Sequence, residues 1–207
     1  MKMKSIYIFA ALLCNITFIY AQDTSKITDS PSVKKPYWFV PSYINLQYAG
    51  NTGMLSANAG YYLYKDKLYW SFGYGYTPSN QAGRDIHNGI FRLGYKPWSI
   101  DIKLQQDFIL TPFFVNLTVT KQLNSKYTWS ELPNYYPKDY YHQNAVRLHL
   151  DFGVSLKHGF KKFELETYYY VTTNDVYVTY VKYYYHDSKL YLHKIFSSAI
   201  GLNFIFF

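Results

Sequence analysis

Apolar and polar positions alternate in several stretches of the chain, most clearly at its C-terminus. Residues 195–207 carry no acidic or basic side chain, and Ile200, Leu202, Phe204 and Phe206 share one parity. A period of two predicts a β-strand. An exposed apolar strand is an aggregation hazard in water, whereas a closed barrel in lipid pairs every edge and buries the apolar face in the bilayer. The pattern therefore predicts the closing strand of a transmembrane barrel.

Further alternating segments cover residues 67–76, 86–96, 98–107, 146–157 and 161–171. In most of them one face carries large apolar or aromatic side chains, while the other carries charges and glycines. A soluble β-sandwich also alternates. Rings opposite charges are more typical of a lipid-facing exterior around a polar lumen. We therefore predict an all-β fold, namely a transmembrane antiparallel β-barrel.

The number of strands follows from the connections. The last strand of such a barrel runs towards the periplasm, short turns lie on that side, and long loops lie outside the cell. Lys96 and Pro97 have the character of a short turn, whereas residues 123–143 form a long loop. Eight strands satisfy this rule if residues 98–122 and 161–182 are single strands.

Ten strands result if those two segments divide at 109–112 and 172–175, and the apolar parity does change between Leu104 and Phe113. However, division places the long loop in the periplasm. Crossing lipid takes about 9 to 11 residues, so a β-bulge beyond the lipid also accounts for the change of parity. We predict eight strands.

The N-terminus has the features of an export signal. Lys2 and Lys4 precede an apolar run over residues 6–20, and Ala21 follows as a small residue before a cleavage point. We expect residues 1–21 to be a cleaved signal peptide, 22–36 a flexible periplasmic lead-in and 37–207 the barrel. A helical anchor is the alternative, but the run is short for one. A lipoprotein signal at Cys14 lacks the expected small residue before it.

Composition and charge agree with an exported membrane protein. The chain contains 26 tyrosines and 15 phenylalanines, and tyrosine is favoured both in strands and at bilayer interfaces. The net charge is +8. Export makes anionic lipid head groups, rather than nucleic acid, the expected partner of this charge. Loss of Cys14 with the leader excludes disulfide chemistry in the mature chain.

Charged residues at lumen-facing positions form the first candidate site. With a turn at Lys96 and Pro97, Arg92 lies opposite Asp101. The expected lumen polar network comprises Arg92, Asp101, Lys103, Arg147, His149, Asp151, Glu164 and Glu166. An eight-stranded barrel has an interior just wide enough to be filled by side chains. We therefore expect a structural polar core, with a narrow ion path as the alternative.

The long loop at 123–143 is the second candidate site. Its expected binding residues are Trp129, Tyr135, Tyr136, Tyr140 and Tyr141. Exposed rings make good recognition surfaces for sugars or protein partners. The alternative is a loop packed over the barrel mouth, or rings resting among lipid head groups.

Residues His186, Asp187 and Ser188 are the third candidate site. Their spacing is superficially similar to that of lipid A deacylases, which use Ser, His and an acid on an eight-stranded barrel. No acid partner can be placed, and the tripeptide is also typical of a solvated turn. Metal-ligand spacings, phosphate-binding glycine loops and nucleophile elbows are absent from the sequence. We expect no enzyme activity, no catalytic residues, no metal and no cofactor.

Four stretches, residues 49–56, 73–78, 95–99 and 136–141, resemble small outer-membrane β-barrel proteins of the Bacteroidetes type. The resemblance runs over most of the mature chain, and the architecture is similar to that of OmpA- and OmpX-like barrels. It implies the barrel fold and the cell outer membrane, and it supplies no catalytic residues.

Together these features lead us to expect a non-enzymatic, integral outer-membrane barrel that presents long extracellular hairpins and an aromatic-rich loop. It would serve as an accessory subunit of a larger outer-membrane complex or as a surface-interaction protein. Outer-membrane lipid and lipopolysaccharide are its expected partners. The alternatives are a lipid A-modifying, deacylase-like enzyme and a narrow pore.

Overall fold

The computed structural model describes residues 39–64, 67–103, 107–124, 146–160, 162–175 and 195–206. These residues form nine β-strands and one helical turn. The elements are β1 (Tyr43–Ala49), β2 (Leu55–Leu63), β3 (Leu68–Thr77), α2 (Ser79–Ala82), β4 (Ile86–Tyr95), β5 (Ile100–Lys103), β6 (Asp107–Gln122), β7 (Val146–Gly159), β8 (Phe163–Asn174) and β9 (Ser197–Phe206). Among the described residues, no helix is long and apolar enough to cross a membrane.

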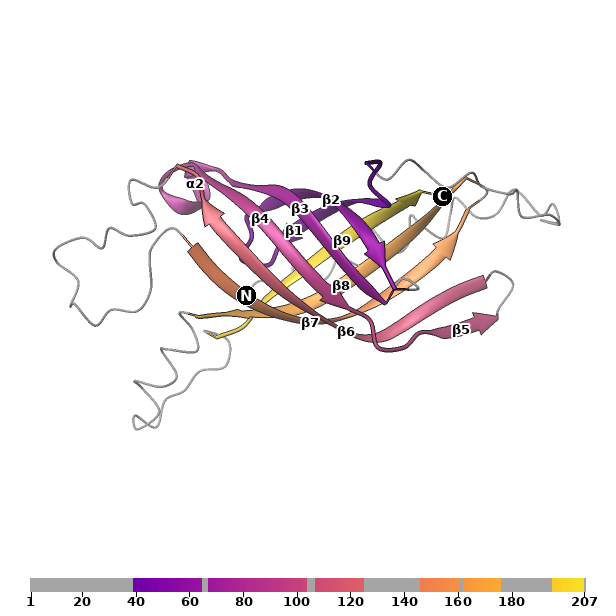
Figure 1. Cartoon of the computed structure of the whole chain (residues 1–207). Helices are drawn as coiled ribbons and strands as arrows, with labels where there is room; N and C mark the ends of the chain where they lie inside the picture. The colour runs from indigo at the N-terminus through magenta and orange to yellow at the C-terminus, as the bar shows by residue number, and fades with distance from the viewer. Residues whose placement is uncertain are drawn as a thin grey trace, which may run out of the picture. The chain divides into compact units, whose positions relative to one another are not determined.

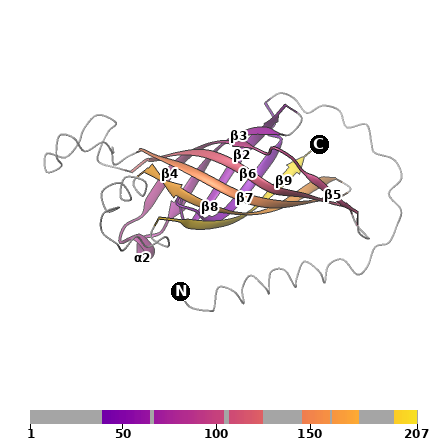
Figure 2. The same cartoon turned by 90° about the horizontal axis from the view of Figure 1, so that it is seen from below.

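The strands close into an eight-stranded antiparallel barrel (Figures 1 and 2). Its order is β1, β2, β3, β4, β6, β7, β8 and β9, and β9 then returns to β1. At this closure Leu46 lies opposite Leu202. The short strand β5 pairs only with β6 and stands outside the closed ring. The prediction of eight strands is therefore confirmed.

The predicted turn at Lys96 and Pro97 is wrong, and so is the strand that was expected to begin at residue 98. Tyr95 of β4 lies opposite Val115, and Ile100 of β5 lies opposite Leu110. Both pairs belong to one antiparallel register along β6. The chain therefore continues in the same direction past Pro97 and reverses only after Lys103. Proline lacks an N–H group, so it interrupts the hydrogen-bond ladder here without reversing the chain.

The predicted β-bulge is present in β6. Thr111 lies opposite Ser155 and Phe114 lies opposite Gly153, so two residues of β6 face one residue of β7. The extra residue changes which face each side chain joins. As a result Phe113 is exposed while Phe114 is buried, which explains the parity change that had suggested a tenth strand.

The barrel has a polar inside and an apolar outside. Among the described residues, seventeen buried side chains are polar or charged and nine are hydrophobic. The residues exposed on the outer wall are large and apolar, such as Leu46 (48% exposed), Phe72 (57%) and Leu117 (43%). This is the reverse of the distribution in a water-soluble domain.

The two ends of the barrel differ in their connections. Residues 64–67, 104–106 and 160–162 join strands at one end, which we call the short-loop end. Residues 50–54, 78–85, 123–145 and 175–196 join strands at the other, the long-loop end. In Figure 1, α2 marks the long-loop end and β5 marks the short-loop end.

Candidate functional site

A polar network fills the interior of the barrel and is the best-defined candidate site. It forms because alternate residues of each strand point inwards. On β8 this alternation buries Glu166, Tyr168, Tyr170 and Thr172. The network has two charged centres, one around Glu166 near the short-loop end and one around Arg92 nearer the long-loop end.

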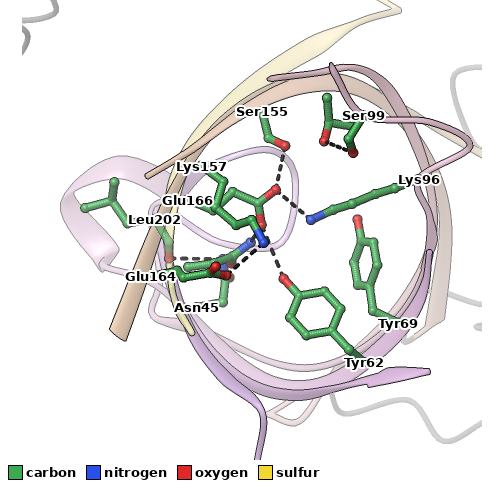
Figure 3. A network of polar contacts seen from close by, with 12 residues as sticks. Asn45, Tyr62, Tyr69, Lys96, Ser99, Ser155, Lys157, Glu164, Glu166 and Leu202 are labelled. Atoms are coloured by element: carbon green, nitrogen blue, oxygen red, sulfur yellow. Dashed lines mark hydrogen bonds and ion pairs between the residues drawn. The ribbon is translucent and has the colours of Figure 1, made fainter. Parts of the chain in front are cut away.

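Both carboxylate oxygens of Glu166 are hydrogen-bonded (Figure 3). Oε1 accepts from Lys96 Nζ at 2.6 Å and from Ser155 Oγ at 2.5 Å. Oε2 accepts from Asn203 Nδ2 at 2.9 Å and from the Tyr62 hydroxyl at 3.3 Å. These donors come from four different parts of the barrel wall, and charge-assisted bonds of this kind are strong. The carboxylate is therefore satisfied without water.

The ammonium group of Lys96 is held by rings as well as by the carboxylate. Its Nζ lies 5.3 Å from the ring centroid of Tyr62 and 5.2 Å from that of Tyr69. Such cation–π contacts stabilise a desolvated ammonium group. The side chain of Lys96 is 12% exposed and that of Glu166 is 2% exposed, so this is a nearly buried ion pair.

The Arg92 guanidinium forms the second centre. Its Nη2 donates to Gln47 Oε1 at 2.8 Å and to the Tyr170 hydroxyl at 3.2 Å, and its Nε donates to Thr118 Oγ1 at 3.3 Å. Thr118 Oγ1 in turn donates to Asp151 Oδ2 at 2.8 Å. The threonine hydroxyl thus links the cation on β4 to the anion on β7.

Neutral side chains connect the two centres. The Tyr168 hydroxyl donates to Gln47 Oε1 at 3.0 Å and accepts from Asn45 Nδ2 at 2.7 Å. Asn45 Nδ2 also donates to Asn203 Oδ1 at 2.7 Å, and Asn203 binds Glu166. A continuous set of hydrogen bonds therefore joins Arg92 to Glu166 across the interior.

The connection between β1 and β2 folds into the long-loop end of the barrel. Ala49, Gly50 and Asn51 all have positive φ angles, which turn the chain sharply inwards. Thr52 is buried, its Oγ1 accepts from Gln47 Nε2 at 2.9 Å, and its carbonyl oxygen accepts from Asn88 Nδ2 at 3.0 Å. This connection therefore covers the Arg92 centre on the side of the long-loop end.

Little space is left between the two centres. A cavity lined by Tyr43, Tyr69, Arg92, Lys96, Phe114, Asn116, Ser155, Glu166, Tyr168 and Asn203 has room for roughly one water molecule. Within the described part of the chain, side chains fill the barrel across both charged centres. This arrangement suits a packed core rather than an aqueous channel.

Six of the eight residues expected in the lumen network are buried or half-buried. Arg92, His149, Asp151 and Glu166 are buried inside the barrel. Glu164 is half-buried near the short-loop end and accepts from Lys157 Nζ at 2.8 Å. Arg147 is half-buried and donates to the carbonyl oxygen of Val146 at 3.2 Å.

The expected pairing of Arg92 with Asp101 is wrong. Arg92 lies opposite Ser71 and Thr118, whereas Asp101 is exposed on β5 opposite Ile109. The error follows from the misplaced turn, because the true reversal after Lys103 carries Asp101 beyond the closed ring. The side chain of Lys103 lies outside the described residues.

The other two candidate sites also lie outside the described residues. They are the aromatic loop, with Trp129, Tyr135, Tyr136, Tyr140 and Tyr141, and the tripeptide His186, Asp187 and Ser188.

Several members of the network were not expected from the sequence, namely Asn45, Gln47, Lys96, Tyr168 and Tyr170. The signal for two of them was present, since Tyr168 and Tyr170 share the parity of Glu166. Tyrosine suits both faces of a membrane barrel, so the residue type alone does not indicate which face it joins. Lys96 was assigned to a turn and was therefore not considered for the lumen.

One hydroxyl–imidazole pair lies close to the Arg92 centre. Thr120 Oγ1 is 2.8 Å from His149 Nε2, which is the contact that a nucleophile makes with its general base. However, His149 Nδ1 and Asp151 Oδ1 have no hydrogen-bond partner among the residues that the structure describes, so no acid among these residues orients the imidazole. Thr120 and His149 are both buried. The described residues also contain no cluster of three or more His, Cys, Asp or Glu suited to a metal ion.

Comparison of the chain with protein-family models, with curated protein sequences and with solved structures finds no match. The class of protein therefore follows from the fold and the interior described above, which define a closed, eight-stranded antiparallel β-barrel with a packed polar core.

Proposed function

We propose that this chain is an integral outer-membrane β-barrel protein without enzyme activity. We further propose that it serves as a scaffold that presents its long-loop end outside the cell. The observation that carries the proposal is the inverted distribution of side chains. Exposed apolar residues follow the outer wall on every strand of the ring, including Leu46, Phe72, Leu93, Leu117 and Phe152. Lipid is the solvent that stabilises such a surface.

The packed interior favours a scaffold over a pore. Arg92 and Glu166 each bind partners from several strands, and the connection between β1 and β2 covers one end. A porin-like channel instead keeps a water-filled lumen. With the lumen occupied, we place the contacts with partners on the connections at the long-loop end, which are the longer ones.

Subcellular fractionation tests the proposed location. We expect the full chain, expressed in a Gram-negative bacterium, to sediment with the outer membrane and to resist extraction by urea. Leu93→Arg should reduce the folded, inserted fraction, because an arginine facing the bilayer midplane costs about 2 to 4 kcal/mol. Ser79→Arg on the exposed turn α2 is the matched control and should insert normally. Recovery of the wild-type chain as a soluble periplasmic protein would refute the proposal.

The proposed accessory role places partner contacts on the loop that includes Trp129 and Tyr135. We expect affinity purification from detergent-solubilised outer membranes to recover a stoichiometric membrane partner. Replacing both residues with alanine should lower that recovery while leaving the barrel folded. Equal recovery from the double variant would exclude this loop as the contact surface.

A further inference from the structure

The hydrogen-bonded wall between β4 and β6 is interrupted near the short-loop end. The pairs on either side of the interruption are Tyr95 with Val115 and Ile100 with Leu110. Residues 96–99 and 111–114 lie between these pairs, and no backbone hydrogen bond joins the two segments. We call these two segments the wall break.

Two prolines and the β-bulge explain the wall break. Pro97 lies in one segment and Pro112 in the other, and neither has an N–H group to donate. The bulge also removes residues 112 and 113 from the pairing with β7. Among the described residues, a hydrogen bond of 3.0 Å between the hydroxyls of Ser99 and Thr111 is the only one across the wall break. The backbone here is therefore not satisfied by its neighbours as it is in the intact ladders.

The wall break contains N–H groups that lack acceptors. The backbone N–H groups of Trp98 and Ser99 donate to no described residue, and neither does the indole N–H of Trp98. Both residues are exposed. A polar group without a partner is strongly unfavourable in lipid, because no water replaces the missing bond. A ligand that brings acceptor oxygens to this point therefore makes hydrogen bonds that the barrel itself does not make.

Three stacked rings border the wall break on the outer wall. Trp98 is 53% exposed, Phe113 37% and Phe152 40%. The Phe113 ring lies 6.3 Å from the Trp98 ring and 6.2 Å from the Phe152 ring, with an interplanar angle of 25° in both cases. Crossing lipid takes about 9 to 11 residues, and such a span counted back from Gln122 along β6 ends at the wall break. A tryptophan at this depth places its ring against acyl chains and its N–H in the head-group layer.

We propose that the wall break binds a glycerophospholipid of the periplasmic leaflet. Its phosphate oxygens accept from the free N–H groups of Trp98 and Ser99, and hydrogen bonds to an ionised acceptor are strong. Its acyl chain lies along the rings of Phe113 and Phe152, which are apolar and exposed on the same face. This inference rests on the proposed function, in which the barrel is inserted with its short-loop end towards the periplasm.

The proposed site does not depend on an unpaired cation. The ammonium group of Lys96, which belongs to the wall break, is bound to Glu166 at 2.6 Å inside the barrel. The exposed Asp101 has the opposite parity to Trp98, so it does not share the face of the rings. A zwitterionic head group therefore suits the wall break, and phosphatidylethanolamine is the first probe.

Native mass spectrometry of the full, folded chain in detergent micelles tests the inference. The probes are phosphatidylethanolamine, a diacylglycerol with the same acyl chains but no phosphate, and bisphosphorylated lipid A. We expect the adduct with phosphatidylethanolamine to be the tightest of the three. Trp98→Phe keeps a ring but removes the indole N–H, so it should weaken this adduct about two- to tenfold, as expected for one hydrogen bond. Trp98→Ala, which also removes the ring, should weaken it further.

Trp70→Phe is the matched control and should bind as wild type. Trp70 also stacks on a neighbouring ring, that of Tyr61 at 4.7 Å, but it lies in an intact ladder between Tyr61 and Leu93. Each variant is first shown to be folded by its heat-modifiable migration on a gel.

Three results would overturn the inference while leaving an outer-membrane location intact. They are binding of the diacylglycerol or of lipid A as tight as that of phosphatidylethanolamine, unchanged binding by Trp98→Ala, and equal losses in Trp98→Phe and Trp70→Phe. A chain that fractionates as a soluble protein would instead refute the proposed function on which the inference rests.

Discussion

At the scale of single residues, the interior shows how a barrel can bury charge. Glu166 receives four hydrogen bonds, and Lys96 lies between two tyrosine rings. Removing one member of a buried ion pair leaves the other uncompensated, and that loss costs more than the pair contributes. A single substitution of Lys96 or Glu166 should therefore lower the stability of the barrel more than replacement of both residues together.

We expect Lys96→Met to lower the free energy of unfolding by about 3 to 5 kcal/mol, because it leaves the Glu166 carboxylate buried without a cation. Adding Glu166→Gln should restore part of this loss. Urea unfolding of the barrel in lipid vesicles, followed by tryptophan fluorescence, measures both. Lys157→Met is the control, since the Lys157–Glu164 pair is more exposed, at 22% and 19%. Lys157→Met should cost under about 1 kcal/mol. A Lys96→Met variant as stable as Lys157→Met would show that Lys96 and Glu166 do not form a buried ion pair.

Gly50 and Gly83 form a second matched pair at this scale. Both have positive φ angles, but a Cβ at Gly50 would lie 2.6 Å from Ala199 Cβ, whereas a Cβ at Gly83 would meet nothing within 4 Å. Gly83→Ala should cost about 1 to 2 kcal/mol from backbone strain alone. Gly50→Ala should cost about 1 to 3 kcal/mol more from overpacking. The temperature at which the folded band is lost on a gel compares them. Equal temperatures would show that the connection between β1 and β2 does not pack inside the barrel.

At the scale of elements, alternation along the sequence predicts the faces of the strands but not their ends. The pattern over residues 146–157 places His149 and Asp151 on the inner face, and both are buried. It does not indicate where the pairing of β4 with β3 ends, because that depends on which strands are neighbours in the barrel. Pro97 therefore suggested a reversal, although the pairing with β6 resumes at Ile100.

The hydrogen-bond partners of the buried charged residues could not be predicted from the sequence either. Arg92 and Glu166 were expected inside from parity alone, and they are buried. However, Arg92 binds Gln47 of β1 and Tyr170 of β8, while Glu166 binds Lys96. Those contacts depend on strand tilt and on barrel closure, which bring together residues from opposite walls. The register of a strand predicts only the residues that lie opposite it on the two adjacent strands.

The position of the reversal between β5 and β6 gives a prediction at this scale. We expect a short epitope inserted between Gln105 and Gln106 to leave the barrel folded, because β5, which precedes it, pairs only with β6 and stands outside the closed ring. The same epitope between Lys96 and Pro97 should reduce the folded fraction, since it would separate β4 from β5 along β6. Heat-modifiable migration measures folding. Normal folding with the insertion at 96/97, together with loss of folding with the insertion at 105/106, would indicate that the chain reverses at Pro97.

At the scale of the whole molecule, the closed ring and the filled interior predict a barrel that does not conduct. Reconstituted into planar bilayers, the wild-type chain should show only background conductance, because Arg92, Glu166 and the inward-folded Thr52 occupy the interior. Steady single-channel steps from the purified barrel would contradict this interpretation and would favour the narrow pore.

In the proposed membrane protein the apolar outer wall faces lipid, and the accessibility of spin labels on this wall measures that contact. Cys14 is the only cysteine, so a Cys14→Ser background allows single labels at Phe72→Cys and Leu117→Cys on the outer wall and at Thr118→Cys inside. In lipid vesicles, labels at 72 and 117 should collide freely with oxygen and rarely with a water-soluble nickel complex. The label at 118 should be shielded from both. Free access of the nickel complex to labels at 72 and 117 would show that the outer wall faces water and not lipid.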